Sequence, residues 1–64
     1  MVRNLKPGMS VQLWYAAARR PLAPYHGMVG TVVTVPRRGT RPFNVGVVVG
    51  GRFVVVPAGQ LRRA

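Results

Sequence analysis

Short runs of alternating apolar and polar residues, separated by glycine and proline, predict β-strands along most of the chain. The first run spans residues 9–15 and opens after the turn signal Pro7-Gly8. Its alternation separates an inward face, which we assign to the core, from an outward face. The inward residues are Met9, Val11, Leu13 and Tyr15, and the outward ones are Ser10, Gln12 and Trp14.

Three further strands and a short final one are predicted over residues 28–35, 43–49, 52–56 and 62–64. Gly30 inside the second strand indicates a bulge or a close backbone approach. Gly50-Gly51, between two valine-rich runs, predicts a two-residue hairpin, because both central positions of a type I′ turn need positive φ. The segment 57–61 is too short for an α-helix and predicts a 3₁₀ turn that brings Leu61 into the core.

The composition favours the same fold class. Thirteen valines and no isoleucine, with eight glycines and six prolines spread along 64 residues, leave no uninterrupted helical stretch of 12 residues. We therefore predict an all-β, five-stranded small barrel with a 3₁₀ turn before the last strand. Closure or near-closure of the sheet would remove most of the unpaired strand edge that is otherwise exposed to aggregation. Residues 1–7 form an N-terminal arm, and residues 8–64 form the barrel.

Charge narrows the possible functions. The chain has nine arginines and one lysine but no aspartate or glutamate, so its net charge is +10. Without carboxylates the chain cannot form a paired-carboxylate glycosidase site, an aspartic dyad or an EF-hand. Without cysteine it has no thiolate metal site and no disulfide. We expect no enzyme activity, no cofactor and no metal, and a partner that is rich in negative charge.

Two segments carry a family resemblance. His26-Gly27-Met28-Val29-Gly30-Thr31-Val32 is similar to the basic-Gly-x-x-Gly-x-Val core of the KOW motif of ribosomal proteins and transcription elongation factors. Residues 53–61 resemble the fourth strand, 3₁₀ turn and return that close SH3-like barrels. The chain has His26 where KOW usually has lysine, and about ten extra residues before it. The resemblance implies an SH3-like barrel of the nucleic-acid-binding, ribosomal or transcription-accessory type.

Two other SH3-like families were compared with the chain. Type II dihydrofolate reductases end similarly, but their Val-Gln-Ile-Tyr segment would fall on residues 53–56, where the glutamine and tyrosine are missing. The variable subunit of ferredoxin-thioredoxin reductase shares a long first loop that runs into Gly-Met-x-Gly-x-Val, as in residues 27–32. That subunit is a partner-binding scaffold, so the fold does not by itself fix a function.

Arginine placement is the main functional signal. Guanidinium groups bind phosphate oxygens through two parallel hydrogen bonds, and arginines in the first two loops could form one positive concavity. The alternative is a solvated basic surface that reflects a GC-rich genome. The predicted phosphate contacts are Arg19 and Arg20 in the first loop, Arg37, Arg38 and Arg41 in the second, and Arg52, Arg62 and Arg63 near the last strands.

The aromatic residues have two interpretations. Trp14, on the outward face, could stack on an unpaired base, or it could cover a barrel opening or pack under the first loop. Tyr25 could contact a sugar or base, or pack against Pro21 and Leu22. Phe43, Phe53 and Tyr15 are assigned to the core.

His26 and the neighbouring glycines have structural interpretations. A single imidazole with no carboxylate or thiol cannot form a metal site and is a weak general base. We expect His26 to bind backbone or to touch phosphate. We expect Gly27 and Gly30 to be required by strand geometry. A phosphate-binding nest is the less favoured alternative, because no helix follows these glycines to supply an N-terminal dipole.

Two functions follow as hypotheses. The first is a non-enzymatic protein that binds nucleic acid through phosphates with low sequence specificity, with RNA favoured over DNA by the KOW resemblance. The second is a structural or accessory subunit of a phage particle, ribosome or polymerase complex, which meets an acidic protein or packaged nucleic acid or associates with itself. The sequence shows no membrane span or signal peptide, so we expect a cytoplasmic protein, or a virion-associated one if phage-encoded.

Overall fold

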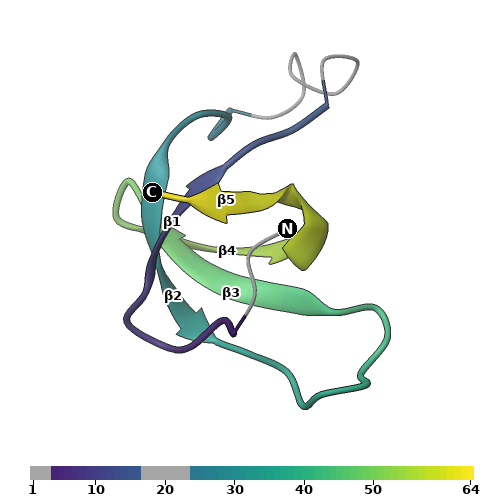
Figure 1. Cartoon of the computed structure of the whole chain (residues 1–64). Coiled ribbons are helices and arrows are strands. Elements are labelled where there is room, and N and C mark those ends of the chain that lie inside the picture. Colours follow the sequence, from purple (N-terminus) through teal and green to yellow (C-terminus); the bar gives the residue numbers. More distant parts are fainter. Residues whose placement is uncertain (1–3, 17–23) are drawn as a thin grey trace.

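A computed structural model describes residues 4–16 and 24–64, and in these ranges the protein is all-β, as predicted. The strands are antiparallel, and a single 3₁₀ turn, η2, precedes the last one (Figure 1). The elements are β1 (Ser10–Leu13), β2 (Val29–Thr34), β3 (Asn44–Val49), β4 (Arg52–Pro57), η2 (Ala58–Gln60) and β5 (Leu61–Arg63). Over the same two ranges, the structure holds no helix long and apolar enough to cross a membrane.

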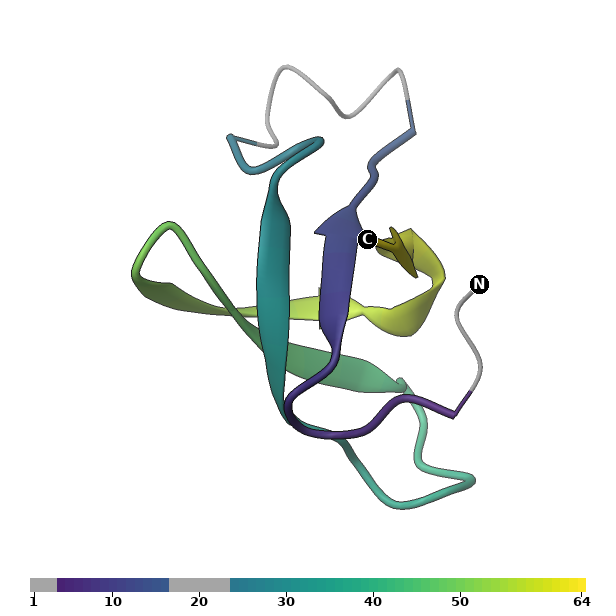
Figure 2. The same cartoon turned by 60° about the vertical axis from the view of Figure 1, so that its left-hand side comes forward.

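The five strands form one sheet in the order β4-β3-β2-β1-β5. Figure 2 shows the sheet strongly bent, with β3 and β4 crossing behind β1 and β2. The described strands form no ladder between β4 and β5, and the sheet is therefore open at this seam. The order of the strands and the 3₁₀ turn before the last strand are SH3-like, but the sheet does not close into a barrel.

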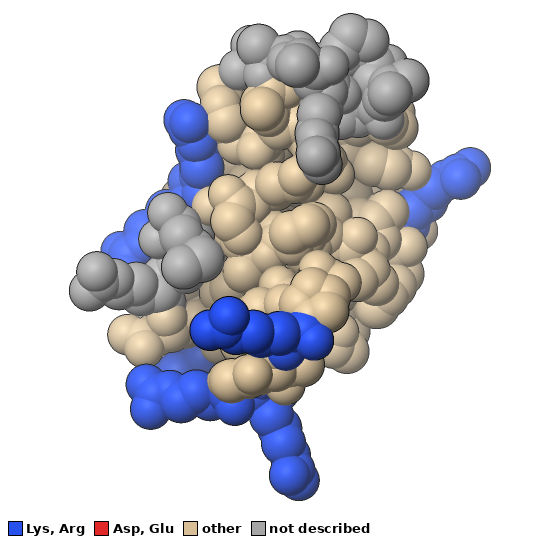
Figure 3. Space-filling view, turned by 90° about the vertical axis from the view of Figure 1, so that its right-hand side faces the viewer, with Lys and Arg blue, Asp and Glu red and all other residues tan. Residues whose placement is uncertain are grey.

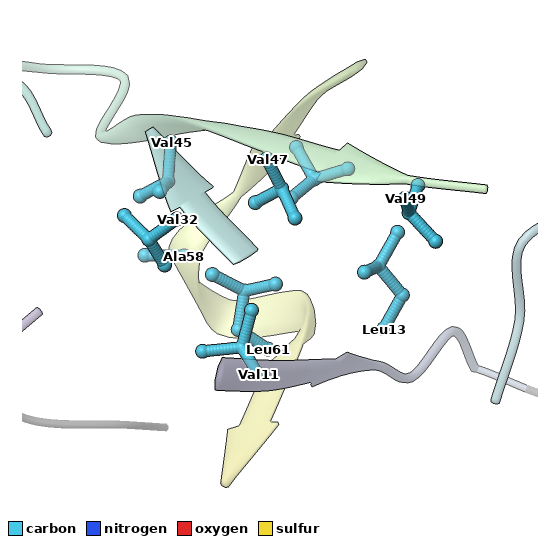
Figure 4. Close-up of a cluster of buried hydrophobic side chains, with 9 residues drawn as sticks. Val11, Leu13, Val32, Val45, Val47, Val49, Ala58 and Leu61 are labelled. Carbon is cyan, nitrogen blue, oxygen red and sulfur yellow. The ribbon is translucent and has the colours of Figure 1, made fainter. Parts of the chain in front are cut away.

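The core consists of small and branched side chains from the inward positions of every strand and from η2. Figure 4 shows these side chains meeting between the two halves of the sheet. They are Val11, Leu13, Val32, Val45, Val47, Val49, Val56, Ala58 and Leu61. Met9 and Tyr15, half-buried, pack against this cluster, which confirms the predicted inward face of the first strand.

The turn chemistry is as predicted. Gly50 and Gly51 have φ values of +57° and +77°, as a tight hairpin between β3 and β4 requires. Leu61 follows η2 into the core and is 1% exposed. Gly30 marks a close approach, because a Cβ there would lie 2.7 Å from both Val47 Cγ1 and the Val48 carbonyl oxygen. The irregularity in β2 lies between Val32 and Thr34 instead.

The core assignment of Phe53 was wrong, since this side chain is 54% exposed. Phe53 pairs with Val48 across the β3–β4 ladder, and both point to the outer face of the sheet. Its ring covers Gly46, where a Cβ would lie 2.6 Å from Phe53 Cζ. In strands that are apolar on both faces, alternation alone did not show which face is inward. Phe43, by contrast, packs against the core as predicted.

Candidate nucleic-acid interface

The loop between β2 and β3 presents three exposed arginines, Arg37, Arg38 and Arg41, over five residues. The Thr40 N–H donates a 3.0 Å hydrogen bond to the Arg37 carbonyl oxygen, which closes a turn. Gly39 has a φ of +87° in this turn, a conformation that favours glycine. The turn thus holds the three arginines on one short segment. In Figure 3, basic side chains gather at the lower end of the molecule, where this loop lies.

Nothing in the protein can neutralise these guanidinium groups through a side chain, because the sequence contains no aspartate or glutamate. Three like charges so close together raise the local positive potential and attract anions from solution. Arginine binds a phosphate through two parallel, charge-assisted hydrogen bonds, which fixes orientation as well as charge. The loop is therefore equipped to hold a phosphate-rich ligand.

The described part of the N-terminal arm lies beside this loop. Leu5 is half-buried and packs against the core, and the Gly8 N–H donates a 2.8 Å hydrogen bond to the Val32 carbonyl oxygen. Between the arm and the loop is an open cavity of about 400 Å³. Its lining includes Asn4, Leu5 and Arg38. Residues 4–8 thus pack against the sheet and help to shape this surface.

A second group of predicted residues meets where β1 pairs with β5. Arg62 lies opposite Gln12 in the ladder, and Trp14 directly follows β1, two residues beyond Gln12, as the diagonal neighbour of Arg62. The Arg62 guanidinium carbon lies 4.3 Å from the centroid of the Trp14 ring, a cation–π distance. The His26 ring is tilted against the same indole at 4.6 Å between centroids. The half-buried indole thus contacts side chains from β5 and from the first loop.

His26 also ties the two ends of the first loop together. The Tyr15 backbone N–H donates a 2.9 Å hydrogen bond to His26 Nδ1, and the Gly27 N–H donates to the Leu13 carbonyl oxygen at 2.6 Å. The predicted backbone contact of His26 is confirmed. Nδ1 accepts a hydrogen bond, so the imidazole here carries its proton on Nε2 when neutral.

The remaining predicted site residues are dispersed. Tyr25 is half-buried and packs against the core. Arg63 is exposed in β5, and Arg52 is exposed next to the β3–β4 hairpin. Arg19 and Arg20, together with Pro21 and Leu22, lie outside the described residues.

The structure groups the described candidates in two places. The β2–β3 loop holds Arg37, Arg38 and Arg41, whereas Arg62 and Trp14 lie at the β1–β5 pair. The described ends of the first loop and the β2–β3 loop lie at opposite ends of β2 (Figures 1 and 2). Because Arg19 and Arg20 lie outside the described residues, the single concavity shared by both loops remains a prediction.

Sequence reasoning missed the contribution of Asn4 and Leu5, which line the cavity beside Arg38. The available signal was Leu5, an apolar residue between the polar Asn4 and the basic Lys6. Sequence reasoning also missed the Arg62–Trp14 contact, because this contact depends on the register between β1 and β5.

Comparison of the chain with protein-family models, with curated proteins and with solved structures finds no match.

Proposed function

We propose that this protein is a non-enzymatic nucleic-acid-binding protein that contacts the phosphate backbone with low sequence specificity. The observation that carries the proposal is the β2–β3 loop, in which three exposed arginines lie within five residues of a chain without acidic side chains. A polyanion supplies the counter-charge that the protein lacks.

Low specificity follows from the few side chains that could read base edges. Outside the N-terminal arm these are Gln12, Asn44 and Gln60. Gln12 already donates a 3.0 Å hydrogen bond from its amide nitrogen to the Gly27 carbonyl oxygen. Most contacts would therefore go to phosphate and sugar, which position a protein without reading sequence. The KOW-like segment, residues 26–32, favours RNA over DNA as the ligand.

Titration of the protein against a structured RNA and a generic duplex at two salt concentrations tests this function. If about six phosphates are neutralised, log K for duplex DNA falls with log salt with a slope near −5. Micromolar or tighter binding with a steep slope supports the proposal. Weak binding that is insensitive to salt contradicts it.

A second function, that of a structural subunit which associates with itself, is favoured by the outer face of the sheet. Exposed apolar side chains lie there on β2, β3 and β4, and the outward positions of these strands carry no charge. An acidic partner would find no counter-charge on this face, whereas two copies could meet there without opposing their positive charges. The apolar residues are Val29, Val33, Val48, Phe53 and Val55.

Sedimentation of the wild type and the Phe53→Ser variant tests self-association. A wild-type dimer that becomes monomeric in Phe53→Ser supports an interface on this face. A wild type that stays monomeric at high micromolar concentration removes the second candidate.

A further inference from the structure

The cavity beside the β2–β3 loop combines apolar walls with a cation. Its volume of about 400 Å³ falls within the range of about 300–1,000 Å³ that is typical of small-molecule sites. The arm, the loop between β2 and β3, and Ala58 of η2 all contribute to it. Lining residues include Asn4, Leu5, Val35, Pro36, Arg38 and Phe43.

The walls suit a flat apolar group. Phe43 is half-buried, packs against the core and is one of the residues that line the cavity, and Leu5 and Val35 add aliphatic surface. Every nucleobase has a π-face that can stack on an aromatic side chain, whatever the sequence. The cavity therefore offers a surface for stacking that the exposed arginines alone do not.

The polar groups suit the remainder of a nucleotide. Arg38 lines the cavity, and Arg37 and Arg41 lie within three residues of it on the same exposed loop, so an anion held on Arg38 would have two further cations near it in the sequence. Asn4 adds an amide, which can both donate to and accept from a base edge. A ligand with a planar ring and a phosphate matches this combination better than a purely aliphatic or a purely anionic one.

We propose that this cavity holds one unpaired nucleotide of a single strand, with its base against Phe43 and its phosphate on Arg38. This inference rests on the proposed function and adds to it a preference for unstacked bases. The flanking phosphates of the strand lie along Arg37 and Arg41, outside the cavity.

Two ligands with the same phosphates test the role of the base. One is a single-stranded octanucleotide, and the other is an octamer of abasic sites with the same backbone. Wild type is expected to bind the octanucleotide about tenfold more tightly, in the lower part of the range for one base–aromatic stack. If neither octamer binds while the structured RNA or the duplex does, the nucleotide site is wrong and the function stands; if none of these ligands binds, the proposed function fails. If both bind equally, the function stands and the nucleotide site is wrong.

Four variants locate the effect. Phe43→Leu keeps an apolar side chain but removes the ring, and should abolish the difference between the two ligands. Phe53→Leu, on the outer face of the sheet, should leave the difference unchanged. Arg38→Gln should lower the affinity for both ligands by a similar factor, and this factor should be larger than the one that Arg52→Gln causes. A difference that survives in Phe43→Leu, or disappears in Phe53→Leu, overturns the assignment.

Wild-type protein alone provides an independent readout if Phe43→Leu does not fold. The methyl NMR signals of Leu5 and Val35 should shift with uridine or adenosine monophosphate and with the octanucleotide, but not with the abasic octamer. Unshifted methyl signals at saturation would overturn the proposal. Decanoate that displaces the octanucleotide, while the monophosphates do not bind, would identify the site as one for anionic aliphatic chains and would also overturn it.

Discussion

At the scale of single residues, glycines set how closely the strands approach. A Cβ on Gly30 would lie 2.7 Å from Val47 Cγ1 and from the Val48 carbonyl oxygen, so β2 and β3 can pack as they do only with glycine here. Gly30 is also the second glycine of the KOW-like segment. The close packing of β2 against β3 is thus enough to explain a glycine at this position, without any ligand.

Gly30→Ala should lower the free energy of unfolding by about 1–3 kcal/mol, because the added methyl group overpacks the β2–β3 contact. Gly59→Ala is the matched control, since a Cβ on Gly59 would have nothing within 4 Å. We expect a change of no more than about 0.5 kcal/mol there. Urea unfolding of both variants measures the difference, and equal stabilities would contradict the close approach.

At the scale of elements, β5 is joined to the sheet by only three residue pairs with β1. The Arg62–Trp14 contact and the 2.8 Å hydrogen bond from the Trp14 N–H to the Gln60 carbonyl oxygen reinforce this pairing. The contact also occupies part of the indole surface that a base would need. Trp14 thus has a structural role in holding β5, the strand next to the open seam.

Arg62→Gln should destabilise the protein by about 0.5–1 kcal/mol, the size of an exposed cation–π contact. It should also alter the emission of Trp14, the single tryptophan of the chain. Arg63→Gln removes the same charge from the neighbouring position and serves as the control. Equal emission spectra for the two variants would show that Arg62 does not cover the indole in solution.

Elements were predictable from sequence where a local rule applied. Alternation gave the inward face of β1, and Gly50-Gly51 gave the hairpin through its positive φ values. Phe53 was misplaced because β3 and β4 carry valine on both faces, so periodicity did not distinguish inside from outside. Three other features depend on register and on packing between distant segments. They are the open seam between β4 and β5, the Arg62–Trp14 contact, and the cavity lined by Leu5 and Phe43. Local patterns do not encode such features.

At the scale of the whole molecule, the absence of carboxylate side chains changes the response to acid. Acid denaturation arises largely because paired carboxylates must be protonated. This chain has no aspartate or glutamate, so no side-chain carboxyl group titrates between pH 5 and pH 2. The fold therefore lacks the usual trigger for unfolding in acid.

We expect the melting temperature at fixed ionic strength to stay within a few degrees between pH 5 and pH 2. At constant pH it should rise with salt, because screening reduces the repulsion among ten positive charges. Circular dichroism melts measure both effects. A cooperative loss of structure on acidification, or a melting temperature that falls with salt, would contradict this electrostatic account.

We expect that the β2–β3 loop, and not positive charge in general, binds the polyanion. Two triple variants with equal net charge separate these explanations: Arg37, Arg38 and Arg41 replaced by glutamine, and Arg52, Arg62 and Arg63 replaced by glutamine. Each lowers the charge from +10 to about +7. Any difference between the two variants then reflects where the charge lies.

Titration of both folded variants with the same duplex over a range of salt concentrations is the most direct measurement. The account predicts that the loop variant binds more weakly than its charge-matched counterpart. Its salt slope should be shallower than that of the wild type by nearly 3, since about 0.9 is lost for each phosphate contact removed. Equal affinities and equal slopes for the two triple variants would contradict it.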